Sequence, residues 1–128
     1  MAYNLTKQVN YSFNEALEKT KESLNKEGFG VISEIDLKTK FKEKLDVEFR
    51  EYRILGACNP ALAHQAIEKE DKIGVLLPCN ILVQEKDEQT AEITAVNPME
   101  TMAAVNNSEL KSIAHEVSQR LQRVIESL

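Results

Sequence analysis

The sequence predicts a single α+β domain with one sheet of about five strands and helices packed on it, in the order β-α-β-α-β-α-β-β-α-α. Segments with apolar residues at every second position alternate with segments in which apolar residues recur every three or four positions. Capping residues precede several of the helical segments. The 128 residues contain no repeat at solenoid spacing and no linker, so we expect residues 1–128 to share one core.

The first half of the chain begins with a strand and a capped helix. Residues 2–10 alternate loosely and predict the strand. Ser12 and Glu15 have the spacing of a capping box, which predicts a helix start. Gly28 supplies the left-handed residue that ends this helix.

A second strand and a second helix follow. We expect one face of the strand to carry these alternate residues: Phe29, Val31, Ser33 and Ile35. Asp36 is the predicted cap of a helix of about ten residues. Leu37, Phe41 and Leu45 form its apolar stripe, and the charged face points outward.

The extended pattern resumes at Val47 and runs to Ala57 as a third strand. Asn59 and Pro60 then predict a helix start, because asparagine caps well and proline at the first helical position needs no amide partner. We expect this short helix to end near Lys69 and to bury three residues, which are Ala63, Ala66 and Ile67.

The second half contains a strand pair and two helical segments. Residues 73–85 are almost continuously apolar, which predicts a strand buried on both faces. Pro78 cannot donate to a strand ladder, so a bulge or an edge segment is expected there. Residues 90–96 form the partner strand, and Asn97 with Pro98 starts another short helix.

The last helix, capped by Asn107, has the widest apolar stripe of the chain. The stripe consists of Leu110, Ile113, Ala114, Val117, Leu121, Val124 and Ile125. A stripe of this width covers either the sheet or a partner subunit.

Composition and charge exclude several classes of function. The net charge is −5, and charges alternate along the chain, so no basic patch for nucleic acid is expected. The basic segment 38–44 is interpreted as a solvated helix face. The sequence predicts no leader and no membrane span. We therefore expect a cytoplasmic protein whose two cysteines are free thiols.

The candidate site consists of Cys58, Asn59, Cys79 and Asn80. Cys58 ends a strand just ahead of a helix cap, where helix amides lower a thiol pKa. A right-handed crossover would make strands 48–57 and 73–85 parallel and would bring both cysteines to a similar height. Asn80 is expected to be a buried amide that holds the backbone near Pro78 or faces a ligand.

Three interpretations of the cysteines stay open. Free cysteines are often simply packed in a core. They can also form a reactive thiol pair, although Cys-x-x-Cys spacing is absent. The third interpretation is a metal or small-ligand site, with Cys58, Cys79 and His64 as ligands of a divalent metal such as zinc. His64 itself is expected to lie on the exposed face of its helix.

The segments Tyr-Arg-Ile-Leu-Gly-Ala-Cys-Asn-Pro-Ala-Leu-Ala at 52–63 and Gly-Val-Leu-Leu-Pro-Cys-Asn at 74–80, with Asn97-Pro98, resemble the bacterial and archaeal family catalogued as domain of unknown function 302. The resemblance covers almost the whole chain. It implies a compact α+β domain that forms a homodimer and has no established enzymatic activity.

These observations favour a non-catalytic binding module for a small ligand or metal, centred on the two Cys-Asn pairs. One alternative is a thiol-dependent redox enzyme that uses Cys58 and Cys79. The other is a structural homodimer assembled through the last helix around Leu121.

Overall fold

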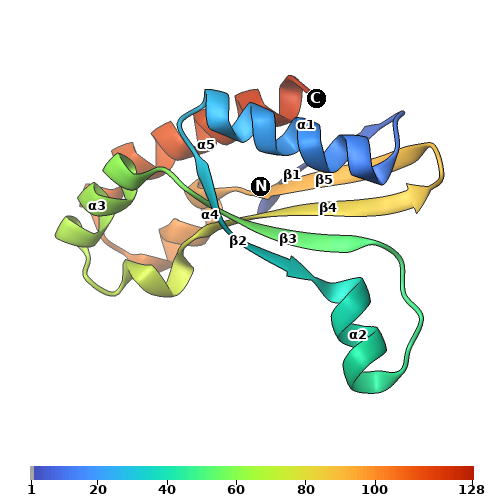
Figure 1. Ribbon diagram of the computed structural model, residues 1–128. Helices are drawn as coiled ribbons and strands as arrows, with labels where there is room; N and C mark the ends of the chain where they lie inside the picture. The colour runs from blue at the N-terminus through green and yellow to red at the C-terminus, as the bar shows by residue number, and fades with distance from the viewer. Residues whose placement is uncertain (1) are drawn as a thin grey trace.

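A five-stranded antiparallel sheet with the strand order β1-β5-β4-β3-β2 forms the centre of the fold (Figure 1). The computed structural model describes residues 2–128. The strands are β1 (Asn4–Val9), β2 (Gly30–Asp36), β3 (Tyr52–Cys58), β4 (Cys79–Asp87) and β5 (Thr90–Val96). The helices are α1 (Phe13–Lys26), α2 (Leu37–Leu45), α3 (Pro60–Lys69), α4 (Pro98–Thr101) and α5 (Lys111–Glu126). The 3₁₀ turns are η1 (Ile73–Leu76), η2 (Met102–Val105) and η3 (Ser108–Leu110). The predicted fold class and element order are confirmed.

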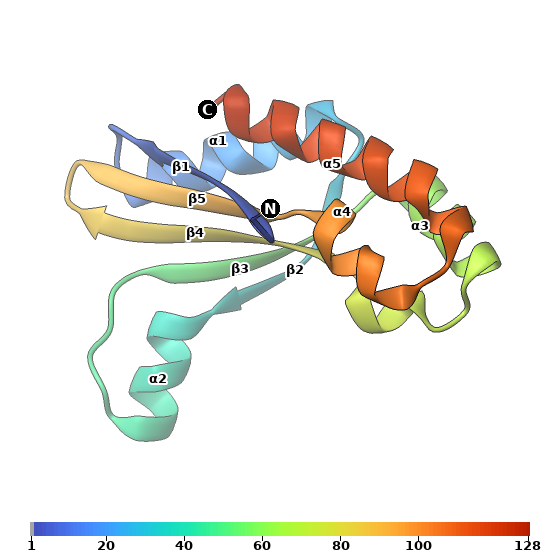
Figure 2. The same cartoon turned by 180° about the vertical axis from the view of Figure 1, so that it is seen from behind.

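Helices α1 and α5 lie side by side on one face of the sheet, as the two opposite views show (Figures 1 and 2). Alternate residues of the central strands face these helices, and Leu55, Ile81 and Ile93 are completely buried there. The core therefore lies in a single layer between the helices and the sheet.

Both covering helices follow from their sequence patterns. The Ser12 hydroxyl accepts a hydrogen bond from the Glu15 amide (3.3 Å), so the predicted start of α1 is confirmed. Every residue of the apolar stripe predicted for the last helix is buried. The stripe covers the sheet. Leu121 has no exposed surface, so the alternative in which Leu121 contacts a partner subunit is wrong.

The prediction that one face of β2 carries its alternate residues from Phe29 to Ile35 is wrong. A β-bulge between Val31 and Ser33 shifts the register against β3. Phe29 and Val31 consequently pack on the core, whereas Ile35 lies on the other side of the sheet. A bulge inserts one residue and reverses the side-chain alternation after it.

The apolar segment 73–85 does not form one strand buried on both faces. Residues Ile73–Leu76 form the 3₁₀ turn η1, in which Val75 is 86% exposed. The Leu77–Pro78 peptide bond is cis, and Pro78 lies just before β4 rather than at a bulge within it. Strand β4 alternates between buried and more exposed residues, because helices cover only one face of the sheet.

Helices α2 and α3 differ from their predicted burial. Helix α3 starts at Pro60 as predicted, but it buries Leu62 and Ala66 and leaves Ile67 exposed. Helix α2 starts after Asp36 as predicted and contains no buried residue. It projects beyond the sheet on the side opposite α1 and α5 (Figure 2). Within residues 2–128, no helix combines the length and the apolar character that a membrane span requires.

Candidate functional site

A small cavity lies where β3 ends, β4 begins and α3 starts. Its volume is about 30 Å³. The cavity is lined mainly by apolar side chains and also by Cys58, Asn59, Cys79 and Met102. The apolar residues of the lining include Phe29, Leu62, Leu77, Ile113 and Val117.

Sheet pairing brings the two cysteines together in a way that differs from the predicted parallel crossover. Strands β3 and β4 are antiparallel, and Cys79 pairs with Ala57, the neighbour of Cys58. In an antiparallel pair, the end of one strand lies beside the beginning of the next. The last residue of β3 and the first residue of β4 therefore meet at one edge of the sheet. The predicted parallel crossover between these strands is wrong.

The two thiols differ in their surroundings. Cys79 is 6% exposed, and Cys58 is partly buried. Burial and, to a smaller extent, the neighbouring Cys58 raise the pKa of the Cys79 thiol to about 11. Because the charged form is disfavoured in an apolar wall, Cys79 is a neutral thiol near pH 7. Both cysteines are free thiols, as expected.

Asn59 has the structural role that the sequence predicts. Its side-chain oxygen accepts a hydrogen bond from the Leu62 amide (3.1 Å) and caps α3. Its amide nitrogen lies close to Gly28, where a Cβ atom would be 2.9 Å away. Gly28 has a φ of 85°, so the end of α1 needs glycine both for its conformation and for the space that Asn59 occupies.

Asn80 is not a buried amide, and the prediction that it needs partners in the core is wrong. It is exposed on the uncovered face of the sheet, because it follows the core-facing Cys79 by one residue. Asn80 is also absent from the lining of the cavity. Three of the four predicted site residues therefore come together, and Asn80 lies apart from them.

His64 lies outside the cavity on the exposed side of α3, as expected from its helical position. Its Nε2 atom lies 3.1 Å from the Glu68 carboxylate, one helical turn away. Among residues 2–128, no three His, Cys, Asp or Glu side chains lie close enough together to hold a metal ion. The predicted ligand set of Cys58, Cys79 and His64 is therefore not assembled.

Met102 is the member of the cavity that sequence reasoning missed. It begins the 3₁₀ turn η2 and is buried. Three positions separate it from Met99, and this helical spacing by itself indicates only a residue that fills a core or an interface. The signal that could have found it is chemical, because a thioether is a metal donor of the same soft class as a thiol.

A larger hollow of about 390 Å³ lies on the other side of Met102. Its walls come from η2, η3 and the start of α5, and include Met99, Asn106, Leu110 and Lys111. Met102 lines both spaces. Neither Cys58 nor Cys79 lines the larger hollow, so the two cysteines belong to the small cavity.

Comparisons with known proteins relate the whole chain to one family. The family model described as domain of unknown function DUF302 matches residues 5–128. The crystal structure of an uncharacterized conserved protein DUF302 from Bacillus stearothermophilus matches with a TM-score of 0.90 and 30% sequence identity, and the match covers 98% of each chain. No curated protein matches. All walls of the small cavity lie within the matched region.

Proposed function

Because the chain belongs to the DUF302 family, whose description names no activity, we propose its function from the chemistry of the small cavity: it binds a soft metal ion such as Cu(I). The thiols of Cys58 and Cys79 are the main ligands, and the thioether of Met102 is the third donor. The observation that carries the proposal is that these three sulfur-bearing residues line one cavity with an otherwise almost wholly apolar wall.

The size of the cavity supports an ion rather than an organic ligand. A space of about 30 Å³ exceeds the roughly 10–15 Å³ that one water molecule needs. It is far below the roughly 300–1,000 Å³ of most small-molecule pockets. A single ion with its sulfur ligands fits such a space, and a metabolite does not.

The donor set favours Cu(I) over the zinc ion expected from the sequence. Structural zinc sites take four nitrogen, sulfur or carboxylate ligands in tetrahedral geometry. The cavity lining contains no histidine and no carboxylate, and the side-chain oxygen of Asn59 already caps α3. Thiolate and thioether ligands suit Cu(I), zinc and iron–sulfur clusters alike. Three sulfur donors are too few for a four-coordinate structural zinc site, and Cu(I) is the soft ion that this smaller set fits.

Binding of the ion requires that the thiols lose their protons. The pKa of the Cys79 thiol is about 11, so the thiol is protonated near neutral pH. A cation that binds Cys79 must therefore displace this proton. At a pH below the thiol pKa, each thiol proton released on binding raises the apparent affinity for the ion about tenfold per pH unit. The affinity for Cu(I) should therefore rise between neutral and alkaline pH.

The test is a titration of the reduced protein with Cu(I) under anaerobic conditions, in competition with a coloured Cu(I) chelator. We expect one equivalent to bind. Cys58→Ser and Cys79→Ser should weaken binding by more than the roughly 10–100-fold that loss of an outer-shell partner causes. Met102→Leu keeps the apolar volume and should weaken binding less. X-ray absorption of the loaded protein should report sulfur ligands only.

Matched controls are His64→Gln and Asn80→Ala, because both residues are outside the cavity lining. Circular dichroism verifies that each variant is folded. The proposal is overturned if the wild-type protein does not compete with the chelator. It is equally overturned if the folded cysteine variants bind Cu(I) as tightly as the two controls.

The alternative function is reversible oxidation of the two thiols, and the adjacency of Cys58 and Cys79 on paired strands favours it. In that reaction both thiols are oxidised, a disulfide forms, two protons leave and an added oxidant such as oxidised glutathione takes the electrons. The raised pKa of Cys79 opposes its use as the attacking thiolate. Intact mass after exposure to oxidised glutathione tests this function, and an unchanged mass would exclude it.

A further inference from the structure

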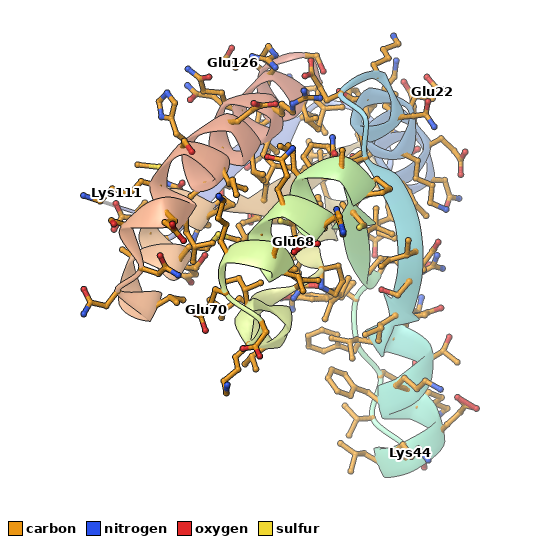
Figure 3. All side chains as sticks on the ribbon, turned by 90° about the vertical axis from the view of Figure 1, so that its left-hand side faces the viewer. Glu22, Lys44, Glu68, Glu70, Lys111 and Glu126 are labelled. Atoms are coloured by element: carbon orange, nitrogen blue, oxygen red, sulfur yellow. The ribbon has the colours of Figure 1, made fainter. Side chains whose placement is uncertain are left out.

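Helix α2 and its connection to β3, residues 37–50, are called the arm below. The helix contains no buried residue, although it has an apolar stripe. At the end of this stripe Leu45 is 66% exposed, and Val47 just beyond it is 44% exposed. Figure 3 shows the arm extending away from the rest of the molecule, with Lys44 near its tip. A flat surface can therefore touch the tip of the arm without contacting the sheet.

Internal contacts give the arm a defined shape. Asp46 ends the helix in the left-handed conformation, with a φ of 53°. The Val47 amide then donates a hydrogen bond to the Phe41 carbonyl (3.3 Å). The rings of Phe41 and Phe49 pack edge to face, with centroids 5.1 Å apart. The connection thus folds back along α2, and the two exposed apolar side chains stay at the tip.

Four lysines flank the apolar stripe of α2 on both sides. Consecutive residues of a helix are rotated by about 100°, so Lys38 and Lys42 lie along one flank of the stripe. Lys40 and Lys44 lie along the other flank, and Glu43 lies on the side of the helix opposite the stripe. An amphipathic helix that lies in a membrane interface has this pattern, because its lysines can extend to the lipid headgroups while its apolar face is buried.

Most of these lysines are free to bind an anion. Lys42 pairs with Asp46 and Glu48, each at 2.8 Å. Within residues 2–128, the other three lysines of α2 form no ion pair with a carboxylate. The sequence alone indicates a solvated basic face for this segment, but the structure adds an exposed apolar tip beside it.

The charge of the molecule is distributed unevenly between the arm and the rest of the chain. Residues 37–50 contain five basic and three acidic residues, so the arm carries +2. Because the whole chain carries −5, the rest of it carries −7. An anionic surface attracts the arm and repels the rest of the molecule. Such a surface therefore orients the molecule with the arm toward it.

We propose that the arm binds the surface of a membrane that contains anionic phospholipids. Leu45 and Val47 enter the boundary between headgroups and acyl chains, and the lysines of α2 bind the lipid phosphates. The phosphates of a nucleic acid would engage the lysines but would leave the aliphatic tip in water. A bilayer offers phosphates and hydrocarbon together. The arm joins the start of β3 and the sulfur-lined cavity lies at its end, so membrane binding does not depend on the proposed metal site.

The first test is co-sedimentation of the protein with phospholipid vesicles. The wild-type protein should sediment with vesicles of phosphatidylcholine and phosphatidylglycerol, and it should stay in solution with vesicles of phosphatidylcholine alone. Added salt should weaken the binding, because it screens exposed charges. Lys44→Gln should weaken the binding about fivefold, the effect of one basic residue near an anionic surface. Leu45→Glu should weaken it at least about tenfold, because it replaces the buried apolar group with a repelled charge.

Two exposed residues outside the arm provide matched controls. Val75→Glu introduces the same charge at a residue that is 86% exposed in η1. Lys111→Gln removes a charge from an exposed lysine at the start of α5, which Figure 3 shows far from Lys44. Both variants should bind the anionic vesicles like the wild-type protein. Circular dichroism verifies that all four variants are folded.

Tryptophan fluorescence gives a second readout at the tip itself. The natural chain contains no tryptophan, so a single introduced indole is the only one that reports. The emission of Leu45→Trp should shift to shorter wavelength with the anionic vesicles, because the indole enters an apolar environment. The emission of Val75→Trp should not shift.

The inference is overturned if the wild-type protein does not bind the anionic vesicles, and an acidic protein would then be the partner to seek for the arm. It is also overturned if vesicles without anionic lipid bind the protein equally well. Equal binding by Leu45→Glu and Val75→Glu, or equal emission shifts of the two tryptophan variants, would show that the arm is not the contact.

Discussion

Gly56 occupies a position in β3 that has no room for a side chain. A Cβ atom there would lie 2.8 Å from Cγ of Pro78 and even closer to the Ser33 hydroxyl. We expect Gly56→Ala to lower the free energy of unfolding by about 1–3 kcal/mol, the range for overpacking. Urea denaturation measures this change.

Gly30 is the matched control in the neighbouring strand β2. No atom lies within 4 Å of a Cβ added there. Gly30→Ala should therefore change the free energy of unfolding by no more than about 0.5 kcal/mol. Equal effects of the two substitutions would show that space at Gly56 does not constrain the sequence.

Cys79 makes stability depend on pH in the alkaline range. Its pKa rises from the ordinary value of 9.0 to about 11 in the folded protein. A raised folded pKa contributes stability that is fully present below the unfolded pKa and is lost as the pH rises through the folded pKa. We expect the free energy of unfolding to fall between pH 9 and pH 11, by about 3 kcal/mol in total.

The measurement compares denaturation of the wild-type protein and Cys79→Ala across this pH range. Tyrosines and lysines titrate in both proteins, so the difference between them isolates the thiol. The Cys79→Ala variant should lose less stability over this range. Parallel curves for the two proteins would contradict the assignment.

At the scale of elements, the two asparagines that cap α-helices, Asn97 and Asn59, differ in their contacts; Asn107 caps η3 and not α5 as predicted. Asn97 begins α4 and is buried, whereas Asn59 only caps α3. The Asn97 side-chain oxygen accepts hydrogen bonds from the Met99 amide (3.2 Å) and the Ser118 hydroxyl (2.9 Å). Its amide nitrogen donates to the Ala2 carbonyl (3.3 Å). One side chain thus connects the chain start, α4 and α5.

Asn97→Ala should therefore lower the free energy of unfolding more than Asn59→Ala. We expect about 1 kcal/mol for Asn59→Ala, as for a lost cap. We expect about 2–4 kcal/mol for Asn97→Ala, because buried partners also lose their hydrogen bonds. Thermal and urea denaturation of both variants test the order, and a larger effect at Asn59 would contradict it.

Helices α2 and α5 show how similar patterns lead to different outcomes. Both have an apolar stripe at helical spacing. In α5 the stripe is buried on the sheet, and in α2 no residue is buried within the chain. Periodicity identifies which face of a helix is apolar, but it does not identify what covers that face.

At the scale of the whole molecule, the homodimer expected from the family resemblance would make thermal stability depend on concentration. Anything that binds only the folded state stabilises it by mass action. The temperature of unfolding of the wild-type protein should therefore rise with protein concentration. Differential scanning calorimetry over a range of concentrations tests this, and a constant wild-type temperature would argue against the dimer.

The sequence by itself determined the features that depend on neighbouring residues. The helix starts at Ser12, Asp36, Asn59 and Asn97 are local, because a cap and its partner lie within three residues. The α+β class and the buried stripe of the last helix also follow from local periodicity. The candidate residues Cys58, Asn59 and Cys79 also stand out in the sequence as a pattern of residue types.

Tertiary structure alone decided where those residues meet. The bulge in β2, the antiparallel pairing of β3 with β4 and the exposure of Asn80 depend on contacts between distant segments. Met102 joins the cysteines only because the chain after β5 returns to the edge of the sheet where β3 ends. Such contacts reflect the packing of the whole chain, whose energy is spread over many side chains and leaves no signature in the sequence of any one of them.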